Sequence, residues 1–194
     1  MDQNAGKLFD KSYWEDIPIE FETIFDDKNK LFTNGSFTPT SSAGERFAEG
    51  FDNAQNLIKM LDKGDILEEG ETIKIMGHSQ GAAYAAGLAA ALLQHPTYKH
   101  LVEFVVYLAP DQPNQFVHPA VVPGYQFSTM SDWVSSKGFL AWARDSGFEL
   151  IDGATWASKR YYYQGSRGGH GVDSWVWEVL RWASQYNIPV TVVE

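Results

Sequence analysis

A serine between two glycines is the first indication of chemistry in this chain. Residues 72–81 read Thr-Ile-Lys-Ile-Met-Gly-His-Ser-Gln-Gly and lead into an alanine-rich segment. A serine at this spacing is typical of a nucleophile elbow, in which a strand turns abruptly into a helix and lifts a strained serine above the sheet. Gly77 and Gly81 would avoid collisions with neighbouring backbone. The amides of the following helix favour a developing oxyanion, so the pattern predicts that Ser79 attacks an acyl carbon.

An ordinary helix start, with Ser79 as its cap, is the alternative reading of this motif, because a serine between glycines also arises by chance. The flanking residues favour the elbow. Ile73 and Ile75 continue a β-branched run before the motif, and small residues suited to close packing follow it from Ala82 to about Leu93. Both the strand and the helix that an elbow requires are therefore predicted.

A serine at neutral pH needs a histidine within hydrogen-bond reach, and that histidine needs a carboxylate to orient it. His170 lies in the stretch Gly-Gly-His-Gly, after a predicted strand at 160–164 and before a predicted final helix at 172–185. A solvent-exposed loop histidine is the alternative, but it leaves the glycine cluster unexplained. His95, His100 and His118 are placed less well, two beside Pro96 at a helix end and one in a proline-rich loop. His170 is therefore the predicted base.

Two aspartates compete for the acid position. Asp111 follows the first predicted strand after the nucleophile, and Asp132 follows the second. In folds with a nucleophile elbow the chain order is serine, acid, histidine, and the acid usually follows the second strand after the nucleophile. Both features favour Asp132. Asp111, between prolines, also suits a turn or a helix cap, and Asp173 suits the first turn of the final helix. Asp132 is the predicted acid, with Asp111 as the alternative.

An oxyanion hole needs two backbone donors, and one of them is the amide after the nucleophile, here that of Gln80. The second is expected from the turn at 34–37, with Ser36 as the first choice and Phe37 as the second. His78 is expected to pack or hydrogen-bond beneath the nucleophile in a structural role. The segment 37–44 either forms a short lid or simply connects two elements.

Strands and helices alternate along the chain, which predicts an α/β fold with a mostly parallel sheet covered on both faces. Functional groups then gather at the carboxyl ends of the strands. The region 139–158 has the weakest pattern, with a helix at 138–145 followed by an irregular excursion, and could help to form a substrate cleft. The other expected elements are strands at 19–25, 31–33, 101–108 and 125–129 and a helix at 42–61, capped by Ser41 or Ser42.

Length and composition indicate one domain spanning residues 1–194, with residues 1 to about 17 peripheral. The net charge of −10 disfavours nucleic acid as a partner, since phosphates require clustered Lys and Arg. No stretch has the roughly 20 apolar residues of a membrane span, and the polar residues 1–11 lack a signal-peptide core. The absence of cysteine excludes thiolate chemistry and leaves the compartment open.

Taken together, these residues resemble the α/β-hydrolase superfamily, and most closely the class 3 (fungal-type) lipases and related bacterial lipase-like domains. The resemblance covers about Leu31 to Trp182 and rests on the turn at 34–36, the elbow, and Asp132 and His170 in the expected order. Gln80 replaces the leucine common in such elbows, the chain is shorter than most of these lipases, and a long lid helix is missing.

The resemblance implies an α/β-hydrolase fold and a serine carboxylic-ester hydrolase, a lipase or phospholipase, that works through an acyl-enzyme without metal or organic cofactor. A lipid or another acyl ester is the expected substrate, with transient membrane-surface contact. Six of the seven tryptophans follow residue 130 and could line an acyl cleft, insert into lipid or form core. The alternatives are a toxin or effector module of a larger secreted bacterial protein, with an inhibitor or immunity protein as partner, a catalytically silent binding module, and a thioesterase or peptidase.

Overall fold

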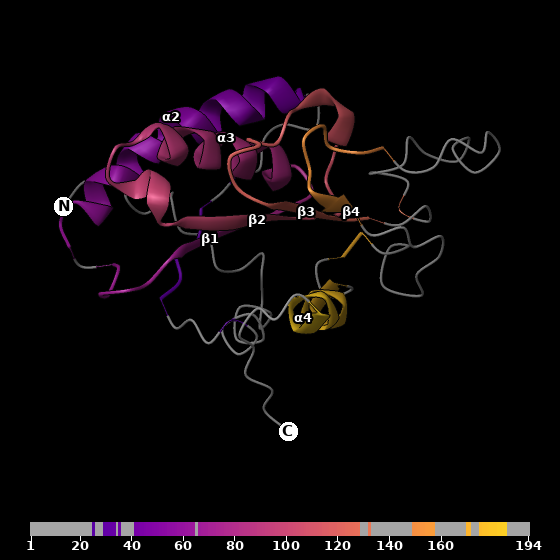
Figure 1. Cartoon of the computed structure of the whole chain (residues 1–194). Coiled ribbons are helices and arrows are strands. Elements are labelled where there is room, and N and C mark those ends of the chain that lie inside the picture. The colour runs from indigo at the N-terminus through magenta and orange to yellow at the C-terminus, as the bar shows by residue number, and fades with distance from the viewer. Residues whose placement is uncertain are drawn as a thin grey trace.

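The fold is built around one parallel sheet with helices on both faces (Figure 1). The computed structural model describes residues 25, 29–33, 35, 41–64, 66–128, 132, 149–157, 170–171 and 175–185. The strands pair in the order β1-β2-β3-β4, all parallel. The predicted α/β class is therefore confirmed. The expected single domain with a peripheral start stays a prediction, because residues 1–24 lie outside the described part.

The bounds of the elements agree with most of the predicted ones. Two short 3-10 helices, η2 and η3, precede β2 and β3. The strands are β1 (Ile73–His78), β2 (Val102–Leu108), β3 (Gly124–Phe127) and β4 (Trp156–Ala157), and the helices are α2 (Ala43–Leu61), α3 (Gly81–Gln94), η2 (Tyr98–His100), η3 (Pro113–Gln115) and α4 (Val176–Gln185).

Strand β2 shows why the sheet must be covered on both sides. Its residues are almost all apolar, and alternate side chains point to opposite faces. Val105 and Tyr107 join the core beneath α2 and α3, whereas Phe104 and Val106 join the core that α4 covers. A strand of this composition is stable only when helices remove both faces from water.

Helix α2 begins at a capping box. The Ser42 hydroxyl accepts a hydrogen bond from the Glu45 amide, and the Glu45 carboxylate accepts one from the Ser42 amide. These bonds to the charged carboxylate lower the pKa of Glu45. Of the two serines predicted as caps, Ser42 is therefore the cap, and this box sets where the chain enters the helix.

Helix α3 is buried between the sheet and α2. All residues from Ala82 to Ala89 are buried, which is typical of a helix that is apolar all round. With 14 residues it is about 21 Å long. None of the helices within the described residues combines the length and apolar character needed to cross a bilayer.

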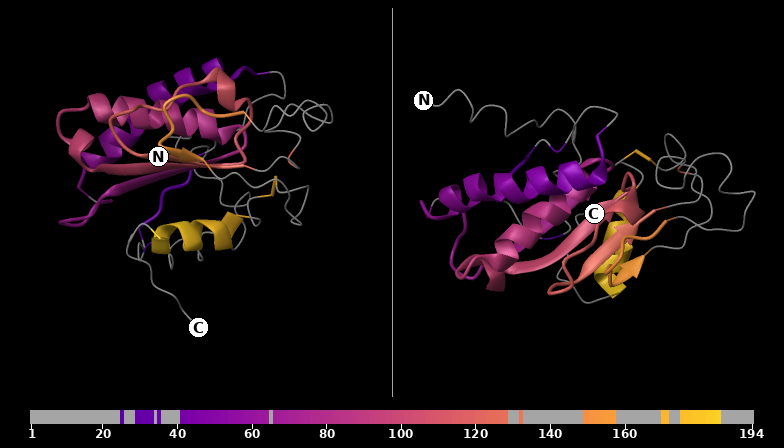
Figure 2. Two further views of the ribbon diagram at one scale, coloured as in Figure 1. Left: turned by 45° about the vertical axis from the view of Figure 1, so that its right-hand side comes forward. Right: turned by 90° about the horizontal axis from the view of Figure 1, so that it is seen from above.

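Helices α2 and α3 cross each other, as Figure 2 shows from above the sheet, and their backbones approach closely at this crossing. A Cβ added to Gly50 on α2 would lie 2.0 Å from the carbonyl oxygen of Tyr84. A Cβ added to Gly87 on α3 would lie 1.9 Å from the carbonyl oxygen of Phe47. Only glycine fits at either position, so this crossing depends on both residues.

The face of the sheet covered by α4 has an aromatic core. Trp175 and Trp182 are fully buried, and the ring of Trp182 lies 5.6 Å from that of Phe104 and 5.8 Å from that of Phe127. The readings that placed tryptophans in an acyl cleft or at a lipid surface are therefore wrong for these two residues. They stabilise the fold.

Some predicted elements differ from the structure. Residues 31–33 have no regular structure, so the strand predicted there is wrong. Phe25 is helical, which contradicts the strand predicted at 19–25 at this residue, and residues 19–24 lie outside the described part. The strand predicted at 160–164 and the segment 172–174 of the final helix also lie outside it. The two-residue strand β4 was missed because it is too short to show a pattern.

His118 is a buried polar residue that the fold must satisfy. Its side chain is 1% exposed. Its Nε2 donates to the carbonyl oxygen of Val122 at 2.7 Å, so its Nδ1 accepts from the Tyr107 hydroxyl, also at 2.7 Å. Burial lowers the pKa of His118, although the Val122 carbonyl opposes this shift. The histidine is therefore neutral in the folded protein near pH 7.

We expect Gly50→Ala and Gly87→Ala each to lower the free energy of unfolding by about 3 kcal/mol or more, because the new methyl group meets fixed helix backbone. Gly44→Ala on α2 is the matched control, since among the described residues a Cβ there meets only the Ser42 hydroxyl at 3.9 Å. It should stabilise by about 0.5–1 kcal/mol through helix propensity. Urea unfolding measures all three, and equal effects at the three positions would contradict the close crossing.

We expect His118 to make the protein less stable at mildly acidic pH. Its folded pKa lies below the unfolded value near 6.5, so the unfolded chain binds the proton first as the pH falls. This contribution to stability is complete above about pH 6.5 and is lost below it. The free energy of unfolding of the wild type should therefore fall relative to that of His118→Gln between pH 7.5 and 5.5. Parallel curves would exclude a depressed pKa at this histidine.

Candidate active site

Ser79 occupies a strained turn between β1 and α3. Its φ is +53°, a left-handed conformation that costs a residue with a side chain about 1–3 kcal/mol. Three backbone hydrogen bonds hold it there: the Ser79 amide donates to Leu108, and the Ser79 carbonyl accepts from Ala82 and Asp111, at 3.0, 3.1 and 3.1 Å. The chain thus turns from strand to helix at the serine, as expected for an elbow.

The two elbow glycines differ in how tightly they are packed. A Cβ on Gly77 would lie 2.5 Å from the carbonyl oxygen of Gly81 and 2.7 Å from the Cβ of Ala85, so the predicted collision at Gly77 is confirmed. For Gly81 the predicted collision is wrong among the described residues, because an added Cβ there meets no atom within 4 Å. The absence of a side chain at Gly77 is what lets α3 approach the end of β1.

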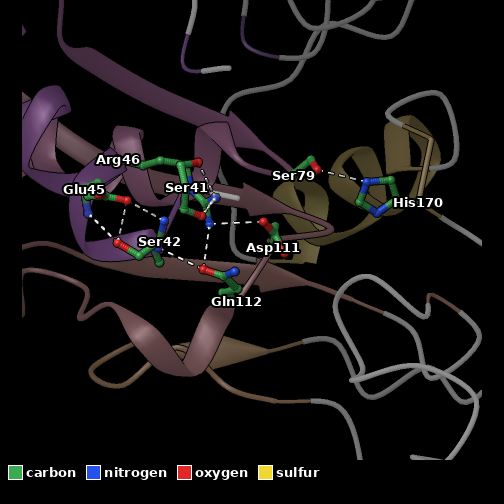
Figure 3. Close-up of polar contacts among 9 residues, drawn as sticks. Ser41, Ser42, Glu45, Arg46, Ser79, Asp111, Gln112 and His170 are labelled. Carbon is green, nitrogen blue, oxygen red and sulfur yellow. Dashed lines mark hydrogen bonds and ion pairs between the residues drawn. The ribbon is translucent and has the colours of Figure 1, made fainter. Parts of the chain in front are cut away.

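A serine, an imidazole and a carboxylate form a continuous hydrogen-bonded chain at this turn. His170 Nε2 lies 2.9 Å from Ser79 Oγ, the contact drawn in Figure 3. His170 Nδ1 lies 3.0 Å from Asp132 Oδ2. A carboxylate only accepts, so Nδ1 carries the proton and Nε2 is left to accept from the serine hydroxyl. The structure therefore brings the three predicted residues together in the order that nucleophile activation needs.

The environments of the imidazole and the carboxylate differ. The Asp132 side chain is fully buried, whereas that of His170 is 12% exposed. Water screens a charge pair less when one partner is buried, so the carboxylate acts on the imidazole at short range and low dielectric. Asp132 follows β3 and His170 precedes α4, which places both groups near the end of the sheet that carries Ser79.

Asp111, the alternative acid, is engaged elsewhere. Its Oδ2 lies 3.1 Å from Nη2 of Arg46, a fully buried residue of α2, as Figure 3 shows. Arg46 also donates to the carbonyl oxygen of Ser41 at 2.9 Å and to the side-chain oxygen of Gln112 at 3.2 Å. Asp111 therefore serves as the counter-ion of a buried cation and makes its contacts away from His170. This role could not be predicted from the sequence, because Arg46 lies among polar residues of an amphipathic helix.

The predicted oxyanion donors are only partly within the described residues. Gln80 directly precedes α3, at the positive end of the helix dipole. Ser36 and Phe37 lie outside the described part, but Gly35 is within it. A Cβ on Gly35 would lie 3.0 Å from the Cα of Gly81, so the residue before Ser36 packs against the start of α3.

The segment predicted as either a lid or a connection is helical at its end. Residues 37–40 lie outside the described part. Ser41 is buried, Ser42 caps α2, and Ala43 and Gly44 already belong to the helix. The described end of this segment, 41–44, is therefore the start of a helix, and the choice between lid and connection stays a prediction.

His78 lies on the opposite side of β1 from α3. Its side chain is 6% exposed, and its Nε2 contacts the backbone carbonyl oxygen of His170. The prediction placed His78 beneath the nucleophile with no named partner, and the partner is the main chain of the predicted base. Sequence reasoning missed this contact because the two histidines are 92 residues apart.

The remaining histidines lie away from the serine. His95 ends α3 and stacks on Tyr98 with ring centroids 4.8 Å apart, and His100 lies in η2. His118 is held by Tyr107 and Val122 as described above. In the described ranges, no three His, Asp or Glu side chains gather closely enough to hold a metal ion.

A cavity of about 270 Å³ lies along β1, but it is separate from this arrangement. Its lining includes Leu31, Leu57, Ile75 and Leu88, and contains neither Ser79 nor His170 nor Asp132. The chemistry that the site can perform therefore depends on the hydrogen-bonded chain rather than on the volume of this cavity.

Comparison of the chain with protein-family models, curated proteins and solved structures finds no match. Membership of a family is therefore not shown, and the resemblance to class 3 lipases stays a hypothesis.

Proposed function

We propose that this chain is a serine hydrolase of carboxylic esters, with Ser79 as nucleophile, His170 as base and Asp132 as the acid that orients it. The observation that carries the proposal is the pair of contacts made by one imidazole, 2.9 Å to Ser79 Oγ and 3.0 Å to Asp132 Oδ2. The strained φ of Ser79 adds weight, because such strain persists mainly where function requires it.

The mechanism follows from the contacts of His170. As the Ser79 oxygen attacks the ester carbonyl carbon, Nε2 of His170 takes the hydroxyl proton. The amides of Gln80 and Ser36 are the proposed donors to the resulting oxyanion. His170 then gives its proton to the leaving alcohol as the ester bond breaks, which leaves an acyl group on Ser79. Water, deprotonated by the same nitrogen, then attacks the acyl carbon. The acid leaves as the bond to the Ser79 oxygen breaks, and His170 returns the proton to that oxygen.

Asp132 would act by orientation and charge. Its bond to Nδ1 holds the imidazole in the tautomer that leaves Nε2 free to accept a proton. When Nε2 is protonated during the reaction, the buried carboxylate stabilises the imidazolium. This role needs a carboxylate, because a neutral amide at the same position provides neither the charge nor the same tautomer.

The order of the elements supports an α/β-hydrolase fold of the lipase type. Strand β1, the elbow and α3 come first, the acid follows β3, and the histidine precedes α4, which is the order serine, acid, histidine. A lipid or phospholipid ester is the proposed substrate, reached by transient contact with a membrane surface. Service as a toxin or effector module of a larger secreted protein, held inactive by an immunity protein, is a proposal of the same kind.

We expect Ser79→Ala to reduce hydrolysis of p-nitrophenyl esters at least about 10³-fold while folding is retained. Short-chain and long-chain esters and phospholipid vesicles are assayed side by side, and the chain-length profile separates esterase from lipase. A fluorophosphonate should label the wild type and leave Ser79→Ala unlabelled.

Ser42→Ala is the matched control, because it loses only the helix cap, which should lower stability by about 1 kcal/mol and preserve activity. Equal turnover by wild type and Ser79→Ala would overturn the proposal. A wild type that neither hydrolyses any ester nor reacts with the fluorophosphonate would favour the silent binding module instead.

We expect the two candidate acids to separate when each is changed to asparagine. Asp132→Asn should lower kcat/KM by about 10³–10⁴-fold, because the imidazole loses its tautomer and charge partner. Asp111→Asn should keep kcat/KM within about tenfold of the wild type. It should instead lower the free energy of unfolding by about 1–3 kcal/mol, because the buried Arg46 loses its counter-ion. The opposite ranking in activity would show that Asp111 is the acid.

A further inference from the structure

Two histidines meet in the candidate active site, and the reaction proposed above uses only one. The Nε2 atom of His78 lies 2.5 Å from the carbonyl oxygen of His170, and the two rings lie 5.2 Å apart. A carbonyl oxygen only accepts hydrogen bonds, so Nε2 of His78 carries a proton and donates it to this bond. The residue whose side chain contacts Ser79 and Asp132 is therefore held at its main chain by a second imidazole.

The strand explains why His78 reaches this place. Side chains alternate along β1, and Gly77 faces α3. His78 must then face the other side of the sheet, which α4 covers. His170 precedes α4 in the chain. The backbone of His78 is paired with Leu108 of β2. The N–H donor of His78 is thus held in place by a strand that pairs with its neighbour.

The acceptor belongs to a turn rather than to a strand. His170 lies in a turn outside any helix or strand, with Gly171 beside it. Its imidazole must keep one nitrogen on Ser79 and the other on Asp132, and a displacement of about 1 Å can reduce an enzyme's rate by about 10²-fold. A donor to the main chain of His170 would restrict such displacement without touching either contact of the ring.

We infer that His78 is a positioning residue, whose Nε2–H bond to the His170 carbonyl holds that histidine between Ser79 and Asp132. The inference rests on the proposed function and deepens it. His78 takes no proton from the serine and gives none to the leaving group. It acts through His170, and any side chain that presents an N–H donor at the same reach should replace it.

The test uses substitutions that separate the effect of the N–H donor of His78 from the effect of its side-chain volume. His78→Gln keeps an N–H at the reach of Nε2, whereas His78→Met fills similar space without a donor and His78→Asn carries a donor that is too short. His118→Met is the matched control, since His118 is also buried and also donates through Nε2 to a backbone carbonyl, that of Val122.

We expect His78→Met and His78→Asn to lower kcat on a p-nitrophenyl ester by about 10- to 100-fold with little change in KM, and His78→Gln to stay within about threefold of the wild type. His118→Met should lower stability and keep kcat. A wild-type kcat in His78→Met would overturn the inference, and so would a loss in His78→Gln as large as that in His78→Met. If His78→Met does not fold, the comparison of His78→Asn with His78→Gln decides.

A spectroscopic readout tests the contact without any substrate. The Nδ1 proton of His170, shared with Asp132, should give a far-downfield proton resonance that disappears in His170→Gln. We expect it in the wild type, His78→Gln and His118→Met, and expect it to be lost or broadened in His78→Met and His78→Asn. An unchanged resonance in His78→Met would overturn the positioning role. If Ser79→Ala retained full activity, the proposed function would fail, while this resonance would still decide the role of His78.

Discussion

The close approach of α3 to the end of β1 is the constraint on which the site depends. The carbonyl of Gly81 and the side chain of Ala85 lie close to the Cα of Gly77, in space that the Cβ of any other residue would occupy. The chain can turn from strand to helix in so short a space only with Ser79 at positive φ. Three backbone hydrogen bonds, each contributing about 1 kcal/mol, offset the strain and hold the half-buried serine in its turn.

The residues with strained backbone and the candidate catalytic residues lie at the same edge of the sheet. Parallel pairing places His78 beside Leu108, and Leu108 beside Phe127, so the carboxyl ends of three strands lie next to one another. Among the described residues, the positive φ angles outside glycine occur at Ser79, Ala109 and Gln112, all just past β1 or β2. Functional groups collect there because only the strand ends expose side chains that the covering helices do not bury.

Buried charge separates the two aspartates at this edge. Arg46 is fully buried and would destabilise the protein without a counter-ion, and Asp111 provides one. Arg46 also joins α2 to the loop after β2 through its hydrogen bond to Gln112. Asp132 is thus the carboxylate that lies against His170. Asp111 and Asp132 follow neighbouring strands, but they have different roles because Asp111 pairs with a cation and Asp132 with an imidazole.

The sequence by itself determined the elements whose pattern is local, namely the strand, turn and helix around Ser79, the cap of α2, and the order of Asp132 and His170 along the chain. These depend on side-chain periodicity and turn chemistry within a few residues. Only the tertiary structure decided what lies beside what. It paired Asp111 with a buried arginine, left residues 31–33 without a strand, placed two tryptophans in the core, and set the main chain of one histidine against the ring of another 92 residues away. Such contacts arise from the packing of whole layers, which no local pattern of residues records.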